Sequence, residues 1–191
     1  QFLDVYSYGF GDSYVHPPLT KDGSMEEFNK KYLVHNLGCS FCPTQCHQNY
    51  YVPGVGAVGT GCWNFEPFRF LIKNEHDTKL WFKGIMMAQD YGIDSHVIAS
   101  ITGWLMLLYA KGIITADDTD GIPMEWASEE AVTTVINKVC RKEGFGALFA
   151  DGIVPASKVI AGGKGTEFIQ HRDRMLLPFP AHPHGLGMGM G

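Results

Sequence analysis

Hydrophobic residues recur at helical spacing in three stretches of the chain, 78–90, 95–111 and 128–143. Positions three and four residues apart lie on one face of an α-helix, so each stretch predicts a helix with an apolar face. The middle stretch is apolar on nearly all sides, which predicts a helix buried in the core. The clearest stripe belongs to the last stretch and consists of Ala131, Val132, Val135, Ile136 and Val139.

Residues that favour helix ends bracket these stretches. Side-chain oxygens that can accept a hydrogen bond from a free backbone N–H stand at the three starts. These are Asp77, then Asp94 or Ser95, then Ser128. Glycines, which readily take the left-handed conformation that terminates a helix, stand at the three ends. These are Gly92, Gly112 and Gly144.

The first half of the chain shows little helical periodicity. Ser24 and Glu27 form a capping box that predicts a helix running to about Val34. Residues 50–52 predict a short strand, and the glycine-rich residues 53–62 predict a loop. Grouped glycines also indicate backbone that packs closely against a bulky group.

Beyond residue 144 the elements are expected to be short. We predict helices over 145–150 and 153–161 and a strand over 167–170. The fold class is therefore mainly α, with loops that carry the chemistry and little β-structure. Residues 1–166 are expected to form one helical domain, and residues 167–191 the truncated start of the next.

The amino-acid composition favours a globular protein over a disordered, nucleic-acid-binding or membrane-spanning one. Of the 191 residues, 45% are hydrophobic and 18% are charged, which indicates a packed globular core. The net charge is -5 and the basic residues are scattered, which argues against nucleic acid as the main partner. The most apolar stretch, 97–110, is shorter than the about 20 residues of a membrane span.

The two chain ends and the number of cysteines indicate what kind of chain this is and where we expect it to be located. The chain begins at Gln1 and ends on an apolar glycine run, so we expect an internal part of a longer protein. An odd number of cysteines, five, in a chain without a secretion signal does not suggest a disulfide framework. We expect a reducing, cytoplasmic location.

Three of the five cysteines, Cys39, Cys42 and Cys46, fall within eight residues. Thiolates this close converge on one soft metal centre, and their spacing can supply three of the four ligands of a cubane iron–sulfur cluster. Zinc is the alternative, but structural zinc sites usually add a second ligand pair, and only His35 and His47 lie close by. Unliganded buried thiols are the third interpretation.

Two other motifs match known binding sites in part, but their neighbouring residues do not fit those sites. Gly54, Gly56 and Gly59 match the dinucleotide fingerprint, but the residues that follow do not begin the helix it requires. The aspartates at 117, 118 and 120, followed by Gly121, hint at a calcium loop, but alanines occupy the positions of its first ligand and its closing glutamate. We expect neither activity.

The cysteine loop, residues 39–46 with the sequence CSFCPTQC, resembles the cluster loop of the aldehyde ferredoxin oxidoreductases, including the proline after the second cysteine. Residues 89–94, QDYGID, are similar to the first pterin-binding motif of that family, Asp-x-x-Gly-Leu-Asp. Similar segments follow in order at 107–121, 143–152 and 177–189. The resemblance therefore covers nearly the whole chain after its first 30 residues or so.

The resemblance implies a tungsten (or molybdenum) bis-pterin enzyme with one [4Fe–4S] cluster, built on the helical middle domain of that fold. The cluster ligands would be Cys39, Cys42 and Cys46. The pterin-binding residues would be Gln89, Asp90, Gly92 and Asp94. Judged without the resemblance, Asp94 is a helix cap and Cys140 is a core residue. The fourth cluster cysteine and the second pterin motif would lie beyond Gly191.

Departures from the family pattern point to one branch. Gln89 replaces the first aspartate of the pterin motif, Asn64 replaces a glutamate near the metal, and Cys62 stands where glycine is expected. Residues 61–67, GCWNFEP, look like the class II benzoyl-CoA reductase branch, whose tungsten is thought to have a cysteine ligand. Cys62 would then bind tungsten, the alternatives being a small buried hydrophobe and a fourth cluster ligand.

The resemblance implies reduction of the aromatic ring of benzoyl-CoA to a cyclic dienoyl-CoA, with an aryl-CoA substrate and electrons from a partner iron–sulfur subunit. Oxidation of aldehydes to carboxylates with ferredoxin is the alternative within the family, and a non-catalytic zinc-binding module is the alternative outside it. His182 and His184 would donate protons to the reduced ring, although histidines are more often structural or exposed.

Overall fold

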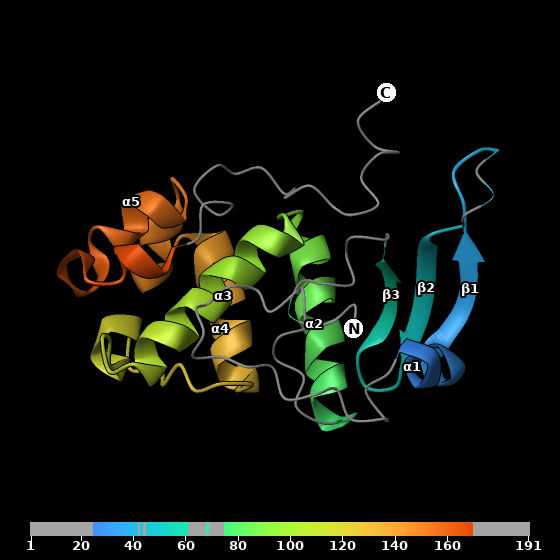
Figure 1. Cartoon of the computed structure of the whole chain (residues 1–191), viewed down its shortest axis with the longest axis horizontal. Coiled ribbons are helices and arrows are strands. Elements are labelled where there is room, and N and C mark those ends of the chain that lie inside the picture. Colours follow the sequence, from blue (N-terminus) through green and yellow to red (C-terminus); the bar gives the residue numbers. More distant parts are fainter. Residues whose placement is uncertain (1–24, 42, 44, 61–67, 69–74, 170–191) are drawn as a thin grey trace.

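The computed structural model describes residues 25–41, 43, 45–60, 68 and 75–169. In this part of the chain a three-stranded antiparallel sheet lies beside a group of helices (Figure 1). The helices and strands are α1 Met25–Tyr32, β1 Leu33–Leu37, β2 His47–Val52, β3 Gly56–Thr60, α2 Glu75–Tyr91, α3 Ser95–Ala110, α4 Glu129–Arg141 and α5 Ile153–Ser157. Short 3-10 turns lie at Ala116–Thr119, Gly144–Phe149, Ile160–Gly163 and Thr166–Phe168.

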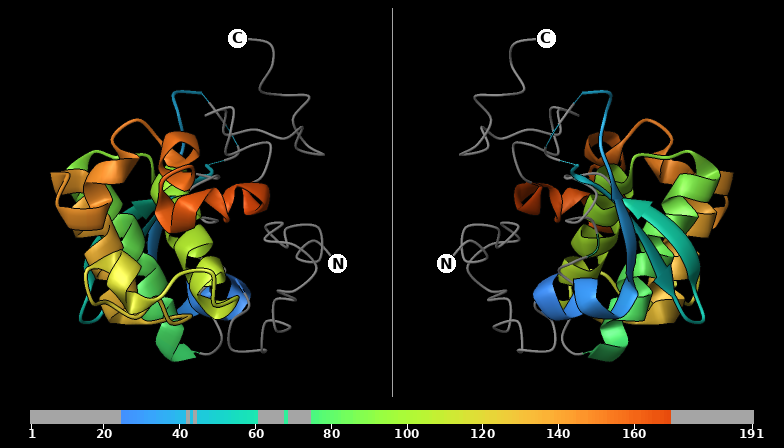
Figure 2. Two further views of the ribbon diagram at one scale, coloured as in Figure 1. Left: turned by 90° about the vertical axis from the view of Figure 1, so that its left-hand side faces the viewer. Right: turned by 90° about the vertical axis from the view of Figure 1, so that its right-hand side faces the viewer.

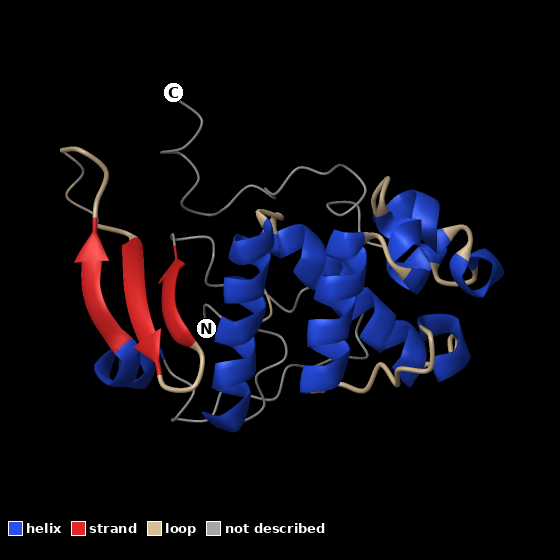
Figure 3. Cartoon of the chain, turned by 180° about the vertical axis from the view of Figure 1, so that it is seen from behind, coloured by secondary structure: helices blue, strands red, loops and turns tan. Residues whose placement is uncertain are grey.

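The sheet has the order β1-β2-β3, and each strand is antiparallel to the next. Side chains of a strand alternate between its two faces, so Tyr50 and Val52 on β2 share a face with Val58 on β3. All three are buried, and this inner face packs toward α2. Figure 3 shows β1 at the edge of the sheet that is farther from the long helices.

The three long helices end in the same way. In each, two backbone N–H groups beyond the last turn bond back to its carbonyls, as Ile93 N does to Ala88 O and Gly92 N to Gln89 O. The residue that carries the first of these two N–H groups is left-handed: Gly92 after α2, Gly112 after α3 and Lys142 after α4. The predicted stops at Gly92 and Gly112 are confirmed. Lys142, and not Gly144, makes the stop of α4, because the helix ends two residues earlier than the glycine suggests.

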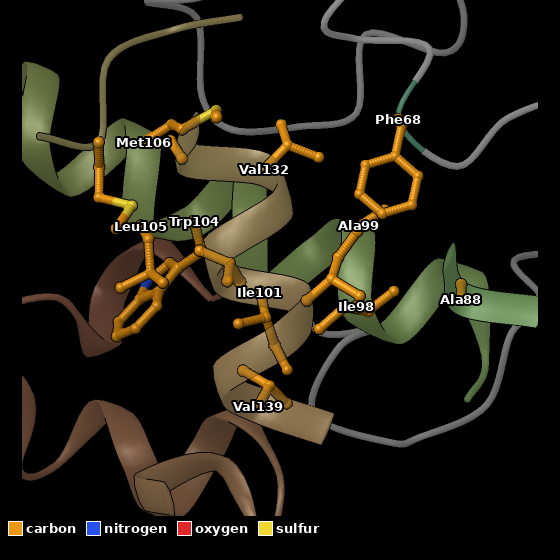
Figure 4. Packing of buried hydrophobic residues seen from close by; sticks show 14 of the residues in the cluster. Phe68, Ala88, Ile98, Ala99, Ile101, Trp104, Leu105, Met106, Val132 and Val139 are labelled. Carbon is orange, nitrogen blue, oxygen red and sulfur yellow. The ribbon is translucent and has the colours of Figure 1, made fainter. Parts of the chain in front are cut away.

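The core is centred on α3, which packs against both α2 and α4 (Figure 2). Ile98, Trp104 and Leu105 are buried on this helix, together with most of their neighbours (Figure 4). The Trp104 indole Nε1 donates to Gly165 O at 3.0 Å, so the largest side chain of α3 also satisfies its one polar atom. The predicted apolar stripe of α4 is buried against α3.

The prediction of three helices in a mainly helical fold is confirmed. Ser128 caps α4 by accepting from Ala131 N, as expected. Asp94 rather than Ser95 caps α3. The expected start of α2 at residue 78 was wrong, since the helix begins at Glu75.

The sheet is larger than the sequence pattern indicated. The first helix ends at Tyr32 and not at Val34, and β1 follows at once. The expected loop over 53–62 was wrong in part, because residues 56–60 form β3. β3 has the sequence GAVGT, in which glycine and alanine suit a strand only where a neighbour lies close, a condition that no local pattern reveals.

The last described elements are shorter than expected, and one of them is a 3-10 turn instead of a strand. The predicted strand at 167–170 was wrong over its described part, since Thr166–Phe168 is a 3-10 turn whose Thr166 Oγ1 donates to Gly163 O. The predicted helix at 153–161 ends at Ser157, and Ala161 and Gly162 beyond it are left-handed. The domain boundary at residue 166 stays a prediction. Within the described ranges, no helix has the length and apolar character needed to cross a bilayer.

Candidate cofactor site

The cysteine loop joins β1 to β2. The two strands pair Leu37 with His47, so the loop closes just beyond this pair. Cys39 lies two residues after Leu37 and is exposed, and Cys46 lies one residue before His47 and is half-buried. The hairpin therefore brings these two thiols to the same end of the sheet. Cys42, the middle cysteine, lies outside the described residues.

Two residues of the loop have strained backbones. Phe41 and Gln45 take left-handed conformations, with φ of 63° and 44°. Residues other than glycine adopt such angles uncommonly, and they cluster at functional sites. The Phe41 side chain is fully exposed, so no buried apolar contact explains its position. The strain supports a ligand-binding role for the loop.

Near the loop, the described residues offer two thiols as possible metal ligands. Cys39 and Cys46 are free thiols. His35, a candidate zinc ligand, has its Nε2 3.0 Å from Asn49 Nδ2 and accepts a hydrogen bond there. Among the described residues no group of three His, Cys, Asp or Glu side chains is placed to hold a metal ion. A metal centre at this loop would therefore need further ligands from outside the described residues, and the Cys42 prediction stays a prediction.

The predicted pterin motif forms the turn between α2 and α3. A Cβ built on Gly92 would meet no atom within 4 Å, so the backbone there faces open space. Asp94 Oδ1 accepts from His96 N at 2.7 Å and from Val97 N at 3.2 Å, which confirms its capping role. Its side chain is 53% exposed, which leaves the second carboxylate oxygen accessible to a donor such as a pterin amino group. Asp90 is also exposed.

The turn is attached to its neighbours on two sides. Gln89 Nε2 donates to Gly59 O on β3 at 2.5 Å. On the other side Tyr91 Oη donates to Asn137 Oδ1 at 2.8 Å and accepts from Arg141 Nε at 3.0 Å, both on α4. The polypeptide at the motif is thus fixed between the sheet and α4.

The cysteine loop and the turn lie at one end of the molecule. Because the strands are antiparallel, the end of β1, the start of β2 and the end of β3 share one side of the sheet. The bond from Gln89 brings the end of α2 to that same side (Figure 1). Two strand spacings across the sheet amount to about 10 Å. The fold therefore brings together two motifs that are about 45 residues apart in the sequence.

The remaining candidate residues lie either outside the described residues or on α4. Cys62, His182 and His184 lie outside the described residues, so their roles stay predictions. Cys140 lies half-buried on α4, and burial raises the pKa of its thiol, which is consistent with its predicted place in the core.

A shallow pocket lies near the opposite end of α2. Lys79, Lys83 and Glu129 are among its lining residues, and Lys83 Nζ is 2.5 Å from Glu129 Oε1. Residue 79 is roughly 20 Å along the helix from Gly92 at 1.5 Å per residue. Both lysines of the pocket are surface residues. The pocket is therefore separate from the end of the molecule that carries the cysteine loop and the α2–α3 turn.

Sequence reasoning missed the residues that hold the turn. Gly59 appeared only as part of a false dinucleotide fingerprint, and nothing in the sequence pattern singled out Asn137 or Arg141. Their contacts link elements far apart in the chain, so no local pattern could identify them. Tyr91 carried one signal, since an aromatic side chain beside a helix-ending glycine is placed to contact a neighbouring element.

Comparison with known proteins adds the following. Residues 6–191 match the family described as aldehyde ferredoxin oxidoreductase, domains 2 and 3. A tungsten-containing aldehyde ferredoxin oxidoreductase of Pyrococcus abyssi is 28% identical over 173 residues, which are 86% of this chain and 28% of that protein. The corresponding protein of Pyrococcus furiosus is 30% identical over 138 residues, 71% of this chain and 22% of that protein.

A third relative has a different name. The aliphatic sulfonate oxidoreductase WOR-like subunit of Pyrococcus furiosus is 26% identical over 163 residues, 78% of this chain and 23% of that protein. Among solved structures, the active site complex BamBC of benzoyl coenzyme A reductase, in complex with 1,5-dienoyl-CoA, superposes with a TM-score of 0.63 at 20% identity. It covers 75% of this chain and 21% of that chain, which shows a shared fold. This chain spans less than a third of the curated relatives it matches.

Proposed function

The chain belongs to the aldehyde ferredoxin oxidoreductase family, and we propose that it is part of an enzyme that reduces the aromatic ring of an aryl-CoA thioester. The observation that carries this proposal is the place of Cys62 in the sequence, close after a strand that is hydrogen-bonded to the α2–α3 turn. Cys62 follows two residues after Thr60, the last residue of β3, and Gln89 ties that end of β3 to the turn. A thiolate suits a soft, sulfur-rich metal.

The residues present fit the cofactors of such an enzyme. We propose that Cys39, Cys42 and Cys46 hold a [4Fe–4S] cluster at the β1–β2 loop, and that Gly92 and Asp94 receive a pterin at the α2–α3 turn. Gln89 and Asp90 flank that surface. When bound, the cluster and a tungstopterin supply low-potential electron transfer, for which iron–sulfur centres reach down to about -700 mV.

The chain's own residues have three tasks in this proposal. The hairpin carries the cluster thiolates toward the surface, where Cys39 and Phe41 are exposed and an iron–sulfur partner subunit or ferredoxin can approach. The turn offers an open backbone and an exposed carboxylate to the pterin. His182 and His184 donate protons to the ring, as residues that titrate near neutrality can.

The likeness in fold to the benzoyl coenzyme A reductase complex supports an aryl-CoA substrate, although fold alone does not select one. The names of the curated relatives favour the second candidate, oxidation of an aldehyde to a carboxylate with ferredoxin. The complete enzyme, assayed anaerobically with benzoyl-CoA and with aldehydes, separates the two. Turnover of aldehydes alone would reject the first.

Metal analysis tests the cofactor assignment and the zinc alternative together. Native protein should contain iron and tungsten, and the Cys42→Ser variant should lose iron and all activity because the cluster lacks a ligand. Cys140→Ser is the matched control, since Cys140 lies on α4 away from the cysteine loop, and it should keep both metals. Stoichiometric zinc without iron would support the non-catalytic zinc module.

The role of Cys62 needs its own variant. Cys62→Ala should keep the iron of the cluster but lose turnover and alter the tungsten EPR spectrum, because it removes the proposed thiolate. A variant with the wild-type spectrum and rate would show that Cys62 is not a ligand.

A further inference from the structure

We propose that Gln89 is a positioning residue that fixes the end of β3 against the α2–α3 turn, and so sets the distance between the turn and the segment that follows Thr60. The proposal rests on the family assignment and not on the choice between the two substrates. It assigns the side chain a task within the polypeptide, in addition to any contact with a cofactor.

The backbone of β3 creates the need for such a residue. Among the described strands, β3 lies at an edge of the sheet, and alternate carbonyls of an edge strand point away from the neighbouring strand. Gly59 O receives the Gln89 amide at 2.5 Å, a short contact for an N–H donor to a carbonyl. The hydrogen bond joins a helix to a strand 30 residues earlier in the chain.

The chemistry of the side chain is specific. A primary amide can donate to a carbonyl oxygen, whereas a carboxylate of the same shape can only accept. Glutamate at position 89 would place negative charge against the Gly59 carbonyl. Glutamine therefore supplies a link that an acidic residue at the same position could not.

Gly59 is confined from its other side as well. A Cβ built on Gly59 would lie 3.2 Å from Asn49 Oδ1 on β2, so the Asn49 amide lies close over the glycine. Asn49 is in turn held by His35 on β1. The end of β3 is thus enclosed between the Asn49 amide and the Gln89 amide.

The turn at the other end of the link is also fixed. Tyr91, two residues after Gln89, is held to α4 by Asn137 and Arg141. Asp94 caps α3 through two backbone N–H groups. Since the turn has these independent attachments, loss of the Gln89 bond should release β3 and leave the turn in place.

The test uses the full-length holoenzyme with four variants. Gln89→Glu keeps the shape and removes the donor, and Gln89→Ala removes the side chain. Gln89→Lys restores an N–H donor. Asn36→Asp is the matched control, because it makes the same amide-to-carboxylate change at an exposed residue of β1 for which the described residues show no side-chain hydrogen bond.

Hydrogen exchange, metal content, tungsten EPR and steady-state kinetics are compared. Gln89→Glu and Gln89→Ala should speed exchange of the 56–60 peptide about fivefold, the loss of one net hydrogen bond, and leave α3 and α4 unchanged. Iron and tungsten should stay at wild-type levels, while kcat falls about tenfold with little change in KM, because the reacting groups are misplaced. Gln89→Lys should recover most of kcat, and Asn36→Asp should match wild type.

Three results would overturn the proposal. The first is wild-type exchange and kcat in Gln89→Glu. The second is faster exchange with unchanged kcat and EPR spectrum, which would make the bond merely structural. The third is a Gln89→Lys variant as impaired as Gln89→Glu. If neither benzoyl-CoA nor aldehydes react, the proposed function fails, and the exchange and EPR comparisons still decide the role of Gln89.

Discussion

The helices and the sheet of this chain are stabilised in different ways. α3 is surrounded by apolar contacts, and its ends are satisfied by the Asp94 cap and by backbone hydrogen bonds around Gly112. β1 has Val34 61% and Leu37 47% exposed, and the outer face of the sheet is joined by side-chain hydrogen bonds such as His35 to Asn49. The candidate chemistry lies on the less buried side, where loops can reach cofactors and partners.

The largest expected effect tests the helical half. Trp104→Ala removes a side chain that is 1% exposed and its hydrogen bond to Gly165 O. We expect a loss of about 3–5 kcal/mol in the free energy of unfolding, from transfer and cavity terms. Urea denaturation of the complete protein, followed by circular dichroism, measures it. Trp104→Phe should lose less, and a Trp104→Ala loss below about 1 kcal/mol would contradict the burial argument.

The second prediction concerns a side chain added where the packing between a 3-10 turn and α4 leaves no space for it. Gly146 allows its 3-10 turn to lie directly on α4, since a Cβ there would be 2.2 Å from the Lys138 carbonyl carbon. Because backbone would have to move, Gly146→Ala should cost about 1–3 kcal/mol. The same denaturation experiment measures this cost. Ala147→Ser, the next and exposed residue, is the control and should stay within about 0.5 kcal/mol of wild type.

The third prediction moves to the sheet. Tyr50 is buried on the inner face, and its Oη donates to Asn29 Oδ1 at 2.8 Å. Burial raises the pKa of this phenol above its ordinary value, so it stays a donor at neutral pH. Tyr50→Phe should cost about 1 kcal/mol and speed hydrogen exchange in α1 and β2. Tyr51→Phe, on the exposed face, should change neither, and equal effects of the two would contradict the assigned faces.

The smallest effect concerns a polar contact within the helical half. Lys138 Nζ lies 2.6 Å from Asp120 Oδ2, and this hydrogen bond, followed by that from Phe145 N, lowers the pKa of Asp120. A lowered carboxyl pKa stabilises the fold above the unfolded pKa, and this stability is lost as pH falls through the folded pKa. Because the pair is partly exposed, Asp120→Asn should cost less than about 1 kcal/mol.

Melting temperatures at two pH values check this sign. The difference between wild type and Asp120→Asn should be present at pH 7 and should shrink as the pH falls from the ordinary carboxyl pKa through the lower pKa of the folded state. Asp117→Asn, at an exposed neighbour, serves as the control. A difference that grows on acidification would contradict the assigned cause.

These comparisons explain what could be predicted from the sequence. The long helices follow from local information, since the stripe on α4 and the caps Asp94 and Ser128 lie within a few residues of the bonds they make. β3 depends on contacts with Asn49 and Gln89, which belong to other elements, so its glycines indicated a loop. The cysteine motif was visible because its spacing is local. The Gln89–Gly59 link required the fold.

The hairpin has a consequence for the metal binding proposed at the cysteine loop. A flexible loop loses conformational freedom when its thiolates gather around one centre, and that loss opposes binding. Here the pairing of Leu37 with His47 restrains both ends of the loop, so strand formation contributes part of the required ordering. Uptake of the proposed cluster and the stability of the hairpin would thereby be coupled. Substitutions that weaken the β1–β2 pairing should lower metal affinity even though they touch no ligand.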